Sequence, residues 1–87
     1  MNIETVWYNI KLHEGELFRT ITGVEYTYVV YNDCFLVNNL QSRRITKAMI
    51  EKAIALKNPT VRKIEAEGCR GPSYILGIIM DSRIKGM

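Results

Sequence analysis

The segment that decides the fold class is LFRTITGVEYTYVVYNDCFLV, residues 17–37. It is rich in β-branched and aromatic residues, which favour strands. Two turn signals interrupt it, Thr22-Gly23 and Asn32-Asp33, because glycine, asparagine and aspartate tolerate left-handed backbone angles. Consecutive strands joined by such short turns are antiparallel neighbours. The segment therefore predicts a three-stranded antiparallel meander with strands at 17–22, 24–31 and 34–37.

Helices are predicted on both sides of the meander. Apolar residues in 2–13 recur at helical spacing, and although the same stretch also alternates like a strand, Gly15 just after it favours a helix. The clearest helix covers residues 45–57, with Thr46 as its N-cap and Asn58-Pro59 as its end. Half of its circumference is apolar, so we expect this amphipathic helix to cover one face of the sheet.

The C-terminal third is less regular. Residues 60–67 suit a short helix that begins at Asn58-Pro59 and ends at Gly68. Tyr74–Met80 is an apolar element that suits a helix or a strand equally, and it is expected to pack on the sheet. Residues 84–87 are expected to fray. Together these elements predict one small α+β domain spanning residues 1–87.

Length and composition limit the class of protein. The 87 residues leave no room for a second domain, and 47% hydrophobic with 24% charged residues is typical of a globular chain. Tyr74–Met80 is the longest uncharged apolar stretch, far below the roughly 20 residues that span a bilayer, so no membrane partner is expected. The small core and spare strand edges predict self-association as a homodimer.

Cysteine and histidine are scarce. The first residues lack the pattern of a signal peptide, which predicts a cytoplasmic location and free thiols at Cys34 and Cys69, although a single disulfide between them is the alternative. With His13 as the one histidine, the chain has too few nitrogen and sulfur ligands for a structural zinc site. We expect no metal and no cofactor.

Charge is distributed unevenly along the chain. Residues 1–40 carry a net charge of −3, whereas residues 41–63 carry seven basic residues and one acid. Such asymmetry indicates an acidic partner for the middle of the chain, either nucleic acid or an acidic protein surface.

Two candidate anion sites lie in or near this basic segment. Arg43, Arg44 and Lys47 surround Thr46 at the start of the 45–57 helix, where free backbone N–H groups attract anions. Arg70 lies in a Gly-Cys-Arg-Gly loop whose backbone suits an anion-binding nest. The competing interpretation is that Arg43 and Arg44 pair with glutamates of the acidic first 40 residues.

Two further hypotheses concern aromatic stacking and catalysis. Tyr26 and Tyr28 share one face of the predicted strand, where an exposed pair would stack on bases. Cys69 beside Arg70 suggests a thiolate that His13 could serve as a base. The common catalytic motifs are absent, so we expect no catalytic residues and no enzyme.

The combined prediction is a small non-enzymatic binding or regulatory module. It is expected to contact nucleic-acid phosphates through the basic start of the 45–57 helix. The alternative is a protein-interaction or accessory subunit in which the basic residues 41–63 meet an acidic partner. A remote alternative is a Cys69-dependent enzyme.

Overall fold

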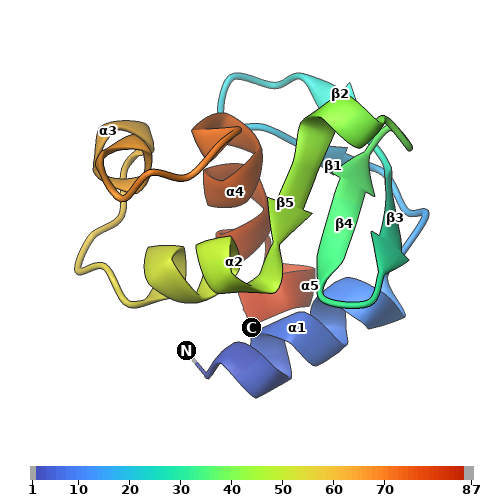
Figure 1. The fold of residues 1–87 in the computed structure, drawn as a ribbon, viewed down its shortest axis with the longest axis horizontal. Helices are drawn as coiled ribbons and strands as arrows, with labels where there is room; N and C mark the ends of the chain where they lie inside the picture. The colour runs from blue at the N-terminus through green and yellow to red at the C-terminus, as the bar shows by residue number, and fades with distance from the viewer. Residues whose placement is uncertain (1, 86–87) are drawn as a thin grey trace.

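The structure is a computed structural model, and it describes residues 2–85. In these residues one helix precedes two small antiparallel sheets, and the remaining α-helices follow them (Figure 1), which confirms the predicted α+β class with an N-terminal helix and a three-stranded meander. The elements in chain order are α1 (Ile3–Leu12), β1 (Phe18–Arg19), β2 (Glu25–Tyr26), β3 (Tyr28–Tyr31), β4 (Cys34–Val37), the 3-10 turn η1 (Gln41–Arg43), β5 (Arg44–Thr46), α2 (Lys47–Ile54), α3 (Val61–Ala66), α4 (Pro72–Ile79) and α5 (Ser82–Lys85).

The strands form two sheets, and the meander is built from later strands than predicted. β1 and β2 form a separate hairpin, closed by a hydrogen bond from the Thr20 N–H to the Val24 carbonyl at 2.9 Å. The three-stranded sheet has the order β3-β4-β5. Both predicted turns are confirmed, since Gly23 and Asn32 have positive φ angles of 91° and 49°.

The predicted strand 24–31 is wrong in one respect, because it is broken at Thr27. The Thr27 carbonyl accepts a hydrogen bond from the Asn38 N–H at 2.8 Å, and its own N–H donates to Asn38 Oδ1 at 3.2 Å. This residue therefore bonds to the turn after β4. The chain on either side of it enters different sheets.

β5 takes the place expected for the start of a helix. Ile45 is 2% exposed and pairs with Phe35 across the sheet, so this apolar residue is buried in a strand and not in the predicted helix. α2 consequently starts at Lys47 and ends at Ile54, inside the predicted range of 45–57. Thr46 is its N-cap as predicted, accepting a hydrogen bond from the Met49 N–H at 3.2 Å.

α1 is confirmed as a helix and closes one end of the molecule. The Asn2 side chain caps it by accepting from the Glu4 N–H at 2.8 Å. Its buried face packs beneath the sheet, where the Trp7 and Phe35 ring centroids lie 6.2 Å apart. Figure 1 shows α5 beside it.

α4 resolves the open alternative for Tyr74–Met80 in favour of a helix. Gly71 is its N-cap, with a φ angle of 61°, and Pro72 occupies the first turn. Ile75–Ile79 are all buried, because α4 lies at the centre of the fold between α3 and β5 (Figure 1) and also packs against α2, β1 and α5. The preceding short helix is confirmed as α3, although its N-cap is Thr60 rather than the predicted Asn58.

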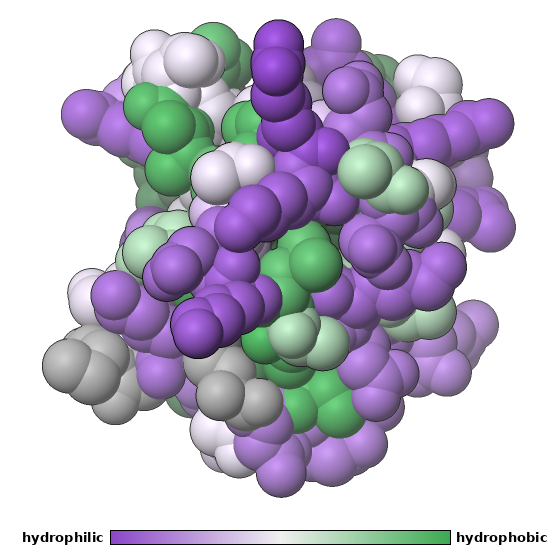
Figure 2. Space-filling model, turned by 90° about the vertical axis from the view of Figure 1, so that its left-hand side faces the viewer, coloured by the Kyte–Doolittle hydropathy of each residue, from purple (hydrophilic) through white to green (hydrophobic). Residues whose placement is uncertain are grey.

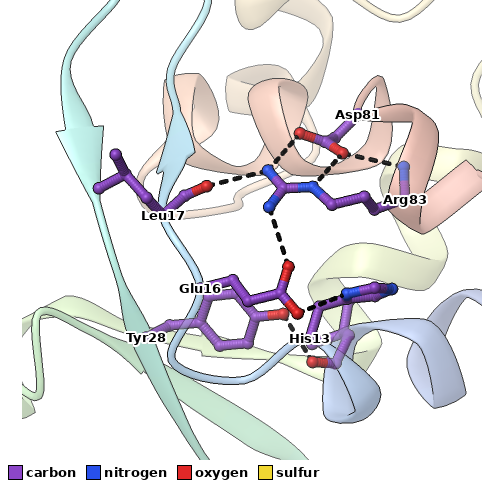
Figure 3. A network of polar contacts seen from close by, with 7 residues as sticks. His13, Glu16, Leu17, Tyr28, Asp81 and Arg83 are labelled. Carbon is purple, nitrogen blue, oxygen red and sulfur yellow. Dashed lines mark hydrogen bonds and ion pairs between the residues drawn. The ribbon is translucent and has the colours of Figure 1, made fainter.

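The fraying predicted for residues 84–87 is wrong for its first two residues; residues 86–87 lie outside the described part. Ile84 in α5 is fully buried, and its carbonyl accepts a hydrogen bond from Asn9 Nδ2 at 2.9 Å. The Arg83 guanidinium bonds both Asp81 carboxylate oxygens at 2.9 Å, Glu16 Oε1 at 3.1 Å and the Leu17 carbonyl at 2.9 Å (Figure 3). These bonds join α5 to the connection between α1 and β1.

The Arg83 network also shifts the titration of its carboxylates. Hydrogen bonds from Arg83 lower the pKa of Asp81 below its ordinary value of 3.8. The hydrogen bond to His13, followed by that to Arg83, lowers the pKa of Glu16 below 4.5. The Arg83 guanidinium also lies 3.8 Å from the centroid of the Phe18 ring, a cation–π contact that places it against the core.

Within residues 2–85 no helix has both the length and the apolar composition needed to cross a membrane. The side of the molecule on which α3 lies is covered mostly by hydrophilic side chains, with an apolar strip between them (Figure 2).

Replacing Gly77 by alanine is expected to destabilise the fold. A Cβ atom there would lie 2.5 Å from the Arg19 carbonyl oxygen and 3.0 Å from the Thr20 Cα, so backbone must move. We expect Gly77→Ala to lower the free energy of unfolding by about 1–3 kcal/mol in urea denaturation, despite alanine's better helix propensity. The exposed Glu65→Ala in α3 is the control and should change it by less than about 0.5 kcal/mol. Equal stability of Gly77→Ala and wild type would contradict this packing.

Replacing Arg83 by glutamine should give a pH-dependent loss of stability. Because folding lowers the pKa of Asp81 and Glu16, these carboxylates stabilise the fold above their ordinary pKa values, and that contribution is lost as the pH falls through the lowered folded-state values. Arg83→Gln should lower the free energy of unfolding by about 1–2 kcal/mol at pH 7. The difference from wild type should shrink between pH 5 and pH 2. Arg19→Gln, which breaks an exposed pair with Glu25, serves as control; a pH-independent difference for Arg83→Gln would refute the linkage.

Candidate anion-binding site

A small pocket brings together three of the four predicted anion-binding residues. It has a volume of about 80 Å³ and is lined by Arg43 and Arg44 from the η1–β5 segment and by Arg70 from the α3–α4 connection. Ser42, Ile45 and Gly71 complete its lining. Arg43 and Arg44 of one predicted site and Arg70 of the other therefore line one pocket, which we call the arginine pocket.

Gly71 allows the two segments to approach each other. Its φ angle of 61° is in the left-handed region, which favours glycine. A Cβ atom built at this position would lie 3.3 Å from Ile45 Cδ1 and 3.3 Å from Tyr74 Cδ2, closer than most real contacts. A larger residue would thus meet both strain and crowding at the pocket wall.

Two of the arginines are oriented by neighbouring side chains. Arg43 Nη1 donates a hydrogen bond to the Tyr74 hydroxyl, and the guanidinium lies 5.7 Å from the centroid of the same ring. Arg44 Nη2 donates to Gln41 Oε1 at 3.2 Å. Since a guanidinium carries five N–H donors, both side chains retain donors for a ligand.

The charge of the arginine pocket is not neutralised from within the described chain. Between residues 2 and 85, no carboxylate forms an ion pair with Arg43, Arg44 or Arg70, and all three are exposed. The interpretation that Arg43 and Arg44 pair with glutamates of the first 40 residues is therefore wrong. Three like charges at one pocket repel each other, and a bound anion would relieve that repulsion.

Lys47, the fourth predicted residue, belongs to a different environment. Its Nζ lies 3.4 Å from Glu4 Oε1, and it lines a separate open hollow at the start of α2 together with Asp33 and Glu51. The helix start that the sequence indicated as an anion site is thus surrounded by acids. The basic residues gather instead where η1 and β5 meet the segment before α4.

Tyr26 and Tyr28 are in the core, so the predicted exposed pair is wrong. They are 2% and 0% exposed, and the Tyr28 hydroxyl donates to the Ile10 carbonyl at 2.6 Å. Burial raises the pKa of both hydroxyls. Their rings pack against Phe18, with centroid distances of 6.2 and 5.3 Å, and cannot stack on a base.

Cys69 is buried, and its environment opposes thiolate formation. It is 6% exposed, and its Sγ donates to the Met49 carbonyl at 3.8 Å. Burial raises its pKa, whereas the hypothesis of an activated thiol requires a lowered one. His13 bonds Glu16 through Nδ1 at 2.9 Å, so each member of the proposed dyad is engaged with other groups.

Sequence reasoning missed Ser42, Ile45, Gly71 and Tyr74 as parts of this site. The stretch Arg70-Gly71-Pro72-Ser73-Tyr74 offered one signal, because a glycine before a proline is typical of a helix start.

Comparisons with known proteins add no further constraint. No protein-family model, curated protein or solved structure matches the chain. Within residues 2–85, no three histidine, cysteine, aspartate or glutamate side chains gather in a way that could hold a metal ion. Function is therefore inferred from the arginine pocket.

The two thiols, which are both free, should differ in reactivity towards a thiol reagent such as DTNB. Cys34 is half-buried, whereas the burial of Cys69 raises its pKa and limits access, so Cys69 should label only as the protein opens. In native protein at pH 8 we expect Cys69 to react at least about tenfold more slowly than Cys34. Cys34→Ser and Cys69→Ser identify the two phases, and urea should equalise them. Fast labelling of Cys69 at pH 6 would instead indicate an activated thiol.

Proposed function

We propose that this protein is a small non-enzymatic module that binds nucleic-acid phosphates in the arginine pocket. One observation supports this above the others: Arg43, Arg44 and Arg70, contributed by two segments separated by α2 and α3, line one pocket without a carboxylate partner among residues 2–85. Uncompensated arginines at one concave site favour an anionic ligand.

The chemistry of the lining favours phosphate among anions. Arginine presents a planar fork of donors that bonds two oxygens of a phosphate at once, and such charge-assisted bonds are stronger than neutral ones. Nucleic acid supplies phosphates at high density, and the net charge of +3 supports long-range attraction. Exposed Lys57 and Lys63, on the connection to α3 and on α3 itself, add positive charge to the segment that follows α2.

The competing function is an accessory subunit that binds an acidic protein surface. Carboxylates also accept two hydrogen bonds from a guanidinium, so the same pocket would serve. Competition separates the two ligands: polyglutamate should displace an acidic protein partner efficiently, whereas an oligonucleotide should displace a nucleic-acid ligand.

Location and assembly form part of the same proposal. A cytoplasmic protein meets nucleic acid directly, and a homodimer would present two arginine pockets to one strand and so increase the apparent affinity. Multi-angle light scattering at several concentrations measures the oligomeric state; a monomer at all of them would remove the homodimer from the proposal.

Fluorescence anisotropy with labelled single-stranded DNA, RNA and duplex DNA tests the nucleic-acid proposal. We expect binding that weakens with salt, and at least about tenfold weaker binding for Arg44→Gln/Arg70→Gln. Loss of the one phosphate contact that the pocket makes should also reduce the slope of log K against log salt by about 0.7 for single strands. The control Lys52→Gln/Arg62→Gln removes the same charge outside the pocket and should have a smaller effect.

Circular dichroism must show that each variant is folded. Absence of binding to all three nucleic acids at low salt would refute the proposed function. Equal losses for the pocket and control variants would assign the binding to net charge rather than to the arginine pocket.

A further inference from the structure

We infer that the arginine pocket receives the terminal phosphomonoester at the end of a nucleic-acid strand, in preference to an internal phosphodiester. This inference rests on the proposed function and specifies the part of the ligand that the pocket recognises. Three observations support it: the size of the pocket, its closed wall and the number of guanidiniums that line it.

The pocket has space for one charged group. Its volume of about 80 Å³ is far below the roughly 300–1,000 Å³ of pockets that enclose a whole small molecule. A nucleoside must therefore remain outside while the phosphoryl group enters. This excludes recognition of a base within the pocket.

One wall of the pocket is closed by the contact between β5 and the start of α4. Ile45 is 2% exposed, and even one added carbon atom at Gly71 would lie 3.3 Å from its Cδ1. An internal phosphodiester must leave a pocket in two directions, because the strand continues on both sides. A terminal phosphate is joined to the strand by a single ester bond. The strand therefore leaves the pocket in one direction, which a pocket with a closed wall accommodates.

The donors match a phosphomonoester better than a phosphodiester. A phosphomonoester has three terminal oxygens and a charge of about −1.5 to −2 at pH 7, with a second pKa of about 6. An internal phosphate carries one negative charge. Arg43, Arg44 and Arg70 supply three positive charges, so the dianion relieves more of their repulsion.

The test compares one single-stranded oligonucleotide with a 5′-phosphate, with a 3′-phosphate and with hydroxyl groups at both ends. Anisotropy is measured with an internal label at near-physiological salt. We expect at least one phosphorylated form to bind about tenfold more tightly than the hydroxyl form. A mononucleotide should compete, whereas the corresponding nucleoside should not.

Titration of the ligand provides a readout that needs no variant. As the pH falls from 7.5 to 5.5, the terminal phosphate gains a proton while the arginines stay charged. The preference for the phosphorylated end should therefore shrink several-fold. Arg70→Gln should also reduce the preference at pH 7.5, and Arg62→Gln should leave it unchanged.

The outcomes distinguish this inference from the proposed function. Equal, arginine-dependent binding of all three oligonucleotides would overturn the inference and leave the proposed function standing. No binding of any of them would overturn both. A preference that persists in Arg44→Gln/Arg70→Gln would place end recognition elsewhere on the molecule and so overturn the inference.

Discussion

Enclosure of α4 is the constraint on which the rest of the structure depends. The last five residues of this helix, Ile75–Ile79, are buried, so other elements must surround this part of it on every side. The β1 backbone lies so close that Gly77 admits no side chain. The same placement brings the start of α4 close to β5. A Cβ atom at the N-cap Gly71 would lie 3.3 Å from Ile45 Cδ1, and the Tyr74 hydroxyl accepts a hydrogen bond from Arg43. The arginine pocket is thus formed at the edge of the core by the burial of α4.

Local patterns predicted the fold class because capping and turn residues act within a few positions. Asn32, Thr46 and Gly68 mark the ends of elements as expected. The distribution of strands between sheets was not predictable, since the break at Thr27 depends on hydrogen bonds that it exchanges with Asn38, which lies after β4. α4 remained ambiguous for another reason: residues 74–80 are nearly all apolar, so no polar face distinguishes a buried helix from a buried strand.

The three arginines of the pocket were predicted individually as candidates, but their assembly at one pocket was not. Arg43 and Arg70 were each recognised from neighbouring residues, whereas their convergence depends on how α2, α3 and α4 pack. Alternation correctly grouped Tyr26 with Tyr28, which both point into the core from different sheets, yet alternation does not reveal whether a residue is buried. For Cys69, the adjacent Arg70 suggested a lowered pKa, and the burial produced by tertiary packing has the opposite and larger effect.

The contact between α1 and residues 81–85 has a consequence for synthesis on the ribosome. α1 emerges before α5, and Asn9 gains its hydrogen-bond partner only when Ile84 has left the exit tunnel. The nascent chain therefore cannot complete its native fold step by step from the N-terminus. Part of the packing of α1 is therefore completed late in synthesis, because α5 is the last element that the structure describes.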